Sequence, residues 1–267
     1  MKLKDKVVLV SGASRGIGAD IARQAVARGS RVGLLARTAS DLDRMSDELG
    51  ARCAAATADV AAPDELRVAV EKISAELGPI DVVVCNAGIG LYGTFLDADV
   101  DDLDRVMRTN YLGTVHLLKA VLPDMVARRS GHVVIIGSIS GRIGSPFEAG
   151  YSASKFAVTG LAEALMVELS PFDIRVSLVL PGPVKTSFFE ARGHEYDRAR
   201  PKPESPEKVA KVALDAVERN RAEAYVSGFM RQAVVSKTLV PPLFQWGTAR
   251  AFAKELAEVR APVAPPA

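Results

Sequence analysis

The sequence predicts an α/β protein built on a parallel β-sheet, and three observations support this. Short, continuous apolar runs rich in valine, leucine and isoleucine recur along the chain, and segments with helical apolar spacing separate them. The 267 residues are 48% hydrophobic and 25% charged, an ordinary globular composition that excludes disordered, collagen-like and coiled-coil chains. Continuous apolar runs suit strands covered on both faces, and strand–helix alternation over this length indicates right-handed crossovers between parallel strands.

The expected strands are the apolar runs taken in chain order. They are Val7–Val10, Val32–Ala36, the weaker Ala51–Ala58, Val82–Cys85, Val133–Ile136, Val176–Leu180 and the short, late Ala224–Val226.

Helix ends are marked by capping residues. Ser205-Pro206-Glu207 predicts an N-cap, a proline at the first helical position and an acidic first turn. The acidic run Asp97–Asp104 is interpreted as a capped helix start and not as a carboxylate cluster. Arg128-Arg129 before Gly131 predicts a basic helix end.

One domain is expected, because no internal repeat or linker interrupts residues 1–228. The stretch that follows differs: Val240-Pro241-Pro242-Leu243-Phe244-Gln245-Trp246 leads into a helical pattern. Residues 229–260 are therefore expected to form a helical extension that completes the substrate pocket or a subunit interface. Residues 261–267, a Pro/Ala tail, are expected to be disordered.

Composition narrows the classes of partner. With 34 Lys and Arg against 32 Asp and Glu, the net charge is +2 and no basic stripe favours nucleic acid. The N-terminal apolar run spans four residues, too few for a signal peptide or a membrane-spanning helix, so a cytoplasmic protein is expected. Cys53 and Cys85 lack metal-ligand spacing and are expected to be buried, reduced thiols, with no metal site.

A glycine-rich loop follows the first expected strand and opens a helix. Gly12, Gly16 and Gly18 in the sequence SGASRGIG would let the backbone approach a pyrophosphate, with the helix N-terminus supplying free N–H groups. No Gly-Lys-Ser/Thr follows, which excludes a P-loop.

The choice of dinucleotide depends on the tip of the second strand. A site for NAD usually carries a carboxylate there, whereas this chain has Ala36-Arg37-Thr38. Arg37 could bind a 2′-phosphate, with help from Ser14 and Arg15, so NADP(H) is the expected cofactor. Asp41 and Asp43 are expected to lie further on, in the next helix.

A tyrosine and a lysine form the candidate catalytic pair. Tyr151 and Lys155 stand four positions apart, on one helical face, so the lysine charge is expected to lower the tyrosine pKa. Ser138 follows the strand at 132–137, where α/β sheets place ligands.

A Ser-His-Asp hydrolase is the enzyme alternative. Gly137-Ser138-Ile139-Ser140-Gly141 matches G-x-S-x-G through Ser140. None of the three histidines has a partner acid at triad-like placement, and the Tyr/Lys pair would be unexplained, so this alternative is disfavoured.

Together these elements resemble the short-chain dehydrogenase/reductase family over residues 5–228. The glycine loop, the Cys85-Asn86-Ala87-Gly88 segment, the Tyr/Lys pair and the Pro181–Thr186 segment follow in the family's order. Ser11 replaces a more usual threonine and Cys85 replaces an asparagine that normally braces the sheet. The resemblance implies a Rossmann-type doubly wound parallel sheet of about seven strands, with helices on both faces.

The resemblance also implies the roles of individual residues. Asn110, Ser138, Tyr151 and Lys155 match the catalytic four, with Tyr151 as general acid/base and Asn110 holding a water that relays protons to Lys155. The implied cofactor-binding residues are Gly12, Ser14, Arg15, Gly16, Ile17, Gly18, Arg37, Asp59, Val60, Asn86, Ala87, Gly88, Tyr151, Lys155, Pro181, Gly182, Val184 and Thr186.

The implied reaction interconverts a carbonyl and a secondary alcohol with NADP(H). Residues 187–204 are expected to cover the substrate, and the C-terminal extension resembles the branch that acts on lipophilic steroid-, retinoid- or acyl-like molecules. A reductase of carrier-bound 3-oxoacyl groups and a non-catalytic NADP-binding regulator are the alternatives.

Two further expectations concern partners. Tyr111–Val121 and Phe156–Leu169 are apolar over most of their circumference, which predicts a homodimer or homotetramer. The extension is expected to pack as core or against a second subunit; a membrane surface is disfavoured because residues 248–260 mix charge signs.

Overall fold

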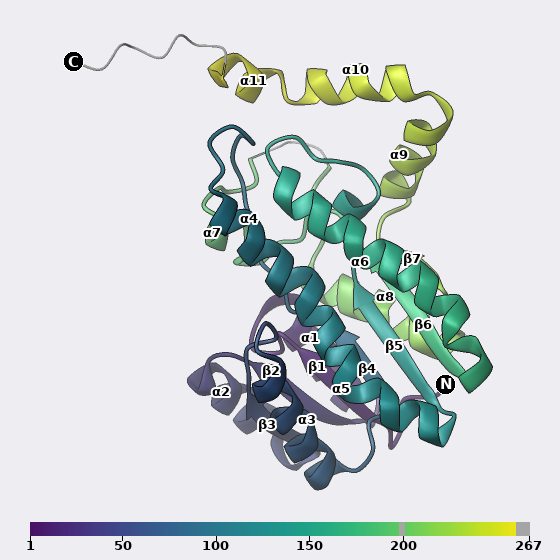
Figure 1. The fold of residues 1–267 in the computed structure, drawn as a ribbon. Coiled ribbons are helices and arrows are strands. Elements are labelled where there is room, and N and C mark those ends of the chain that lie inside the picture. The colour runs from purple at the N-terminus through teal and green to yellow at the C-terminus, as the bar shows by residue number, and fades with distance from the viewer. Residues whose placement is uncertain (198–200, 260–267) are drawn as a thin grey trace.

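The computed structural model describes residues 1–197 and 201–259 and contains the predicted alternation of strands and helices (Figure 1). The strands are β1 (Val7–Ser11), β2 (Arg31–Ala36), β3 (Cys53–Thr57), β4 (Val82–Cys85), β5 (Gly131–Ile136), β6 (Ile174–Leu180) and β7 (Glu223–Tyr225). The helices are α1 (Gly16–Ala27), α2 (Ala39–Leu49), α3 (Pro63–Leu77), α4 (Val100–Met107), α5 (Gly113–Arg128), α6 (Ala149–Glu168), α7 (Phe188–Ala191), α8 (Pro206–Arg219), α9 (Gly228–Leu239), α10 (Pro241–Ala251) and α11 (Ala253–Val259). Every predicted strand is confirmed, with ends shifted by one or two residues.

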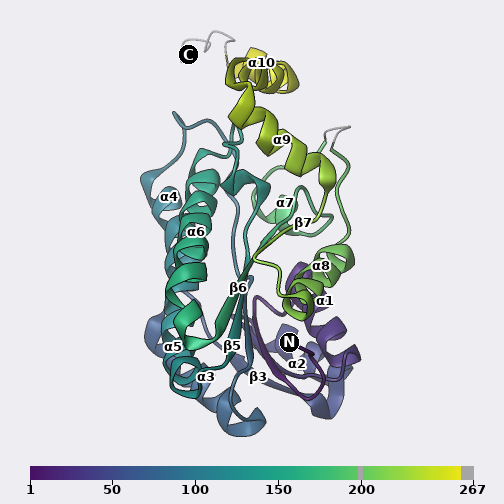
Figure 2. The same ribbon diagram turned by 90° about the vertical axis from the view of Figure 1, so that its right-hand side faces the viewer.

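The strands form one parallel sheet in the order β3-β2-β1-β4-β5-β6-β7. Figure 2 views the sheet nearly edge-on, with α3, α5 and α6 on one side and α1, α2 and α8 on the other. The central strands are buried along their whole length, which explains why their sequences are continuous apolar runs.

The site lies where the strand order reverses. The chain crosses from β1 outward to β2 and β3, and then returns to β4 on the other side of β1. In doubly wound sheets, the diverging connections leave a crevice at the carboxyl ends of those two strands. The glycine loop after β1 and the Asn86 loop after β4 therefore face each other.

The predicted helix ends are confirmed. The Ser205 side chain caps α8 by accepting from the Lys208 N–H, and Asp99 caps α4 by accepting from the Asp101 N–H. Helix α5 ends at Arg128, with Arg129 in the left-handed conformation. Of the two cysteines, Cys85 is buried as expected and Cys53 is only half-buried, because β3 is the edge strand; both thiols are free.

The C-terminal helices depart from the expectation of a packed core. Within the described residues of α9, α10 and α11, Met230 alone is buried. Helices α10 and α11 lie across one end of the molecule, beyond the sheet (Figure 1). The predicted disordered tail, residues 261–267, lies outside the described residues, as do residues 198–200 of the predicted substrate loop. Within the described ranges, no helix is both long enough and apolar enough to cross a membrane.

Candidate active site

The glycine loop leaves no room for side chains. Gly12 and Gly16 have φ angles of +65° and +55°, values that favour glycine. A Cβ on Gly18 would lie 2.2 Å from the carbonyl oxygen of Gly12. Helix α1 starts at Gly16, and no side chain caps its first N–H groups. The loop thus forms a close-fitting cradle whose free N–H groups suit a pyrophosphate.

Ser11 and Asn86 hold the two loops together. The Ser11 hydroxyl accepts from the N–H groups of Asn86 and Ala87, at 3.0 and 3.1 Å, and donates to the Val84 carbonyl. The Asn86 amide donates to the carbonyl oxygens of Ser11 and Gly12. These bonds brace the crevice without the asparagine that Cys85 replaces.

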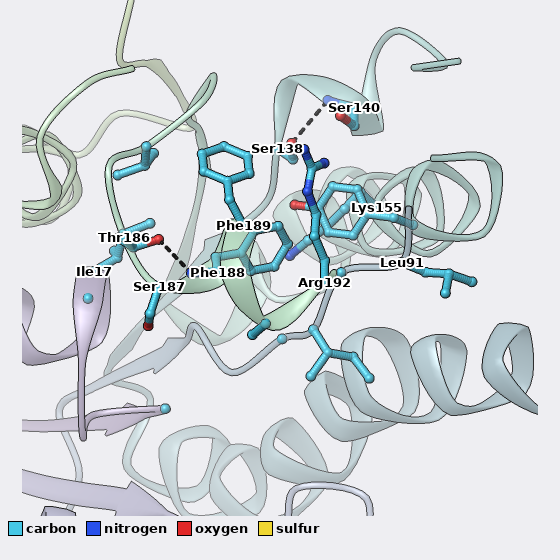
Figure 3. Close-up of a pocket in the computed structure, with 18 of the residues that line it drawn as sticks. Ile17, Leu91, Ser138, Ser140, Lys155, Thr186, Ser187, Phe188, Phe189 and Arg192 are labelled. Carbon is cyan, nitrogen blue, oxygen red and sulfur yellow. Dashed lines mark hydrogen bonds between the residues drawn. The ribbon is translucent and has the colours of Figure 1, made fainter. Parts of the chain in front are cut away.

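Ser138, Tyr151 and Lys155 meet above the end of β5, and all three are buried. Ser138 follows β5 and accepts from the Ser140 N–H at 3.1 Å (Figure 3). Tyr151 and Lys155 lie on the buried face of α6. The Lys155 Nζ lies 5.8 Å from the Tyr151 ring centre and donates a hydrogen bond to the Ile136 carbonyl at 3.0 Å. The Ser138 hydroxyl is a hydrogen-bond partner of the Tyr151 side chain.

Burial governs the protonation of this pair. It raises the pKa of Tyr151 above its ordinary value of 10, and the Ser138 hydrogen bond offsets part of that shift. It lowers the pKa of Lys155 from 10.5 to about 8. The expectation that Lys155 lowers the tyrosine pKa is therefore wrong for the protein without ligand, because desolvation disfavours both charged forms.

Asn110 does not line the cavity but supports the segments that do. It lies in a π-helical turn, Arg108–Leu112, where its side chain is buried. The amide oxygen accepts from the Ile89 N–H at 2.8 Å, and the amide nitrogen donates to the Ile89 carbonyl and the Ser154 hydroxyl. Asn110 therefore ties the loop after β4 to α6.

The end of the crevice beside β2 carries two arginines and two aspartates. Arg37 follows β2, is largely exposed and lies 3.9 Å from a carboxylate oxygen of Asp59. Arg15 is also exposed. Asp41 stands in the first turn of α2, as expected, and pairs with Arg44 at 3.0 Å.

One cavity of about 880 Å³ joins these groups. Its walls include Ser138, Tyr151 and Lys155 of the catalytic four. They also include all the predicted cofactor-binding residues except Gly18, which contributes through close backbone packing. The segment after β6 closes one side: a Cβ on Gly16 would lie 3.2 Å from a methyl carbon of Thr186. The residues present thus fit a dinucleotide.

The far end of the cavity contains a largely buried ion pair that the sequence reasoning missed. Arg192, which follows α7, contacts Glu148 at the start of α6. Its guanidinium carbon lies 4.8 Å from the Tyr92 ring centre and 4.6 Å from that of Phe189. Arg192 stands in a loop with many charges, so no sequence pattern distinguished it.

The hydrolase alternative is contradicted by the positions of the histidines. The Ser140 hydroxyl contacts Ser145 at 3.0 Å. His116 bonds to the Val60 carbonyl and His132 to Ser177. His194 lines the cavity and stacks on Tyr92, with ring centres 4.0 Å apart. No Ser-His-Asp triad exists in the described ranges.

Comparison with known proteins agrees with this geometry. A family model described as short chain dehydrogenase matches residues 6–197. The chain belongs to the short-chain dehydrogenase/reductase family. Dehydrogenase/reductase SDR family member 7B from Xenopus tropicalis is 36% identical over 259 residues, covering 91% of this chain and 84% of that protein.

Two solved structures of the family show the same fold. A short-chain dehydrogenase from Burkholderia cenocepacia, in complex with NADP, has a TM-score of 0.81 and 25% identity, covering 93% of this chain and 99% of its own. A family member from Burkholderia phymatum, in complex with NAD, has a TM-score of 0.82 and 21% identity, covering 100% of this chain and 99% of its own. The predicted family and doubly wound fold are confirmed, and the chain is an oxidoreductase of this family.

Proposed function

We propose that the protein interconverts a carbonyl and a secondary alcohol on a lipophilic molecule, with NADP(H) as cofactor. The observation that carries the proposal is the convergence of Ser138, Tyr151 and Lys155, all buried, in the cavity that the glycine loop also lines. A regulator that only binds the dinucleotide has no need of a buried hydroxyl, phenol and amine at one point.

Each side chain has a role that follows from its surroundings. The bound dinucleotide supplies or accepts the hydride. Ser138 holds the substrate oxygen, and Tyr151, kept neutral by burial, donates a proton to that oxygen during reduction. Lys155 binds the ribose and holds a proton beside Tyr151. The family resemblance adds a water held by Asn110 that relays protons to Lys155; the side chain of Asn110 is itself bonded to Ile89 and Ser154 and positions the loop after β4.

The substrate end of the cavity supports a lipophilic molecule. Phe188 packs 5.5 Å from the Tyr151 ring centre, and Phe189, Leu91, Met230 and Phe252 also line the cavity. The same end of the cavity also carries the Arg192–Glu148 ion pair and His194, so the proposal of a lipophilic substrate rests on the apolar side chains beside Tyr151, with the hydroxyls fixing the reacting oxygen.

Replacing Tyr151 by phenylalanine tests the reaction. The variant loses the proton donor and keeps the ring, so turnover of ketones should fall by roughly 10²–10⁴-fold while NADPH binding is unchanged. Absorbance loss of NADPH against a panel of lipophilic and small polar ketones measures turnover.

Tyr225→Phe removes a phenol hydroxyl from β7, outside the cavity walls, and serves as the control. Full activity of Tyr151→Phe would refute the role of the phenol. Tight NADPH binding without turnover of any ketone by the unmodified protein would favour the regulator, and turnover of small polar ketones alone would refute the lipophilic substrate.

Replacing Arg37 by alanine tests the cofactor. Loss of a charge-assisted contact with the 2′-phosphate should weaken NADPH binding by roughly 10–100-fold and leave NADH binding unchanged. Arg67→Ala, which removes an exposed arginine from α3, is the control. Coenzyme fluorescence is the suitable readout, because the one tryptophan, Trp246, is exposed on α10. Equal affinity of the unmodified protein for NADPH and NADH would contradict the assignment.

A further inference from the structure

Helices α9 and α10 present a long apolar surface to solvent. We call it the outer face: Arg231, Val235, Leu239, Leu243, Trp246 and Arg250. The four apolar members are 49%, 73%, 62% and 62% exposed in that order. The outer face is therefore an apolar stripe with an arginine at each end.

A second, narrower side of α10 and of the residue that follows it is half-buried. Phe244, Thr248 and Phe252 are half-buried at four-residue spacing. Phe252 lines the active-site cavity and stacks on Phe147 at 6.0 Å. At 100° per residue, Leu243, Trp246 and Arg250 lie on the opposite side of the helix. Figure 1 shows α10 lying beyond the sheet, and the exposure of Leu243 and Trp246 agrees with their position on the side of α10 opposite Phe244 and Phe252.

The charged residues within the segment that carries this surface are all basic. Residues 226–254 contain Arg231, Lys237, Arg250 and Lys254 and no aspartate or glutamate. The segment carries +4 and the rest of the chain, with 30 basic and 32 acidic residues, carries −2. The mixed signs noted in the sequence are confined to α11, which contains Glu255 and Glu258.

One of these cations fixes the helices to the body. Lys237 donates to the Arg142 carbonyl at 2.8 Å and lies 5.1 Å from the Phe156 ring centre. Arg231, Arg250 and Lys254 are exposed, and Arg250 lies 5.8 Å from the Trp246 ring centre. These three can neutralise negative charge on a partner.

We propose that the outer face docks on the surface of an anionic lipid bilayer, with α10 lying along the membrane and not crossing it, and α9 connecting it to the body (Figure 1). An apolar stripe containing tryptophan, edged by cations, is the pattern of interfacial helices, and anionic headgroups attract the cations. Pairing with a second copy fits less well, because a two-fold contact would bring arginines together with no carboxylate from α9 or α10 between them. Docking would hold the cavity beside Phe252 close to a store of apolar molecules.

The test is binding to vesicles of phosphatidylcholine, with or without phosphatidylserine, measured by co-sedimentation. The unmodified protein should bind the anionic vesicles, and the fluorescence of Trp246, the one tryptophan, should shift to the blue as its ring leaves water. High salt should weaken binding, because it screens the cations. Neither co-sedimentation nor tryptophan fluorescence depends on catalysis, so their result is independent of whether the proposed reaction is correct.

Two variants locate the contact. Leu243→Asp should reduce binding at least tenfold and Arg250→Glu about fivefold or more. Both positions are exposed, so the variants should keep the far-UV dichroism of the parent. Val68→Asp, which changes an exposed valine on α3, is the matched control and should bind normally.

Two outcomes would overturn the proposal. One is an absence of binding to anionic vesicles, and the other is binding that Leu243→Asp does not change. If the protein ignores vesicles and Leu243→Asp converts an oligomer to a monomer by light scattering, the outer face is a subunit contact instead.

Discussion

Lys155 is a charged side chain held in a largely buried position in the cavity wall. It is buried with its Nζ bonded to the Ile136 carbonyl, and its pKa is lowered from 10.5 to about 8. Below pH 8, the folded protein must keep an ammonium in a poorly solvating place. The catalytic residue is therefore expected to cost stability, as groups at active sites often do.

Replacing Lys155 by methionine should stabilise the protein without ligand by roughly 2–3 kcal/mol at pH 7. The pKa of Lys155 is lower in the folded protein than in the unfolded chain. Between about pH 8 and pH 10.5, the unfolded chain therefore binds more protons than the folded protein. The stability of the unmodified protein therefore rises with pH through this window. The advantage of the variant should shrink by about 1 kcal/mol at pH 9.

Urea unfolding at pH 7 and pH 9 measures this advantage, with Lys2→Met, a change at an exposed lysine, as the control. A variant less stable than the parent at pH 7, or an advantage that does not change with pH, would contradict the burial argument.

Motif spacing was sufficient to predict where Gly12, Ser138, Tyr151 and Lys155 come together, because the backbone geometry of a strand end and a helix face fixes those positions. It did not predict the direction of the Tyr151 pKa shift. The sequence shows the nearby lysine charge, but desolvation depends on residues such as Phe188, which the fold brings from a distant segment.

Among the elements, the strands were the most predictable. Each central strand is covered on both faces, so its whole sequence is apolar. The π-helical turn at Arg108–Leu112 left no such pattern, because it depends on the tertiary bonds of Asn110 to Ile89 and Ser154. The position of α7 could not be predicted from the sequence either, because it depends on the tertiary ion pair between Arg192 and Glu148.

The Arg192–Glu148 pair fastens α7 to α6 over the substrate end of the cavity. Its charges act on Tyr151 in opposite directions: the carboxylate raises the pKa of the tyrosine and the guanidinium lowers it. Removing one partner would leave the other charge in a poorly solvating place.

Arg192→Met should raise the KM for substrate at least tenfold and leave the Kd for NADPH unchanged, because α7 loses its attachment. Amide hydrogen exchange of residues 188–192 should become faster for the same reason. The double change Glu148→Gln and Arg192→Met should recover most of the lost stability, since no unpaired charge stays behind.

Arg67→Met on α3 is the control for loss of an arginine. Unchanged exchange at residues 188–192 in Arg192→Met would show that the pair does not hold α7.

At the scale of the whole molecule, one face of α6 is exposed to solvent in the single subunit. Phe156, Gly160, Glu163 and Val167 repeat close to whole turns and share one side of the helix. Gly160 has open space where a Cβ would lie, and Val167 is 73% exposed. Gly113, in the other helix that the sequence marks as apolar, lies against Val60 of the same chain, where a Cβ would be 2.6 Å from a Val60 methyl carbon.

This face supports the predicted homodimer or homotetramer, and Val167→Glu tests it. In a two-fold contact each substitution occurs twice, and the new carboxylates would join Glu163 on the same face, so repulsion adds to lost apolar burial. Light scattering at micromolar concentration should give a dimer or tetramer for the unmodified protein and a smaller species for the variant.

Val68→Glu on α3 should leave the mass of the assembly unchanged, which separates a specific contact from a general effect of surface charge. A monomeric parent would refute the assembly. A parent oligomer that survives Val167→Glu would move the contact away from α6. The outer face of α9 and α10 would then be the next place to test, because it is the other exposed apolar surface described above.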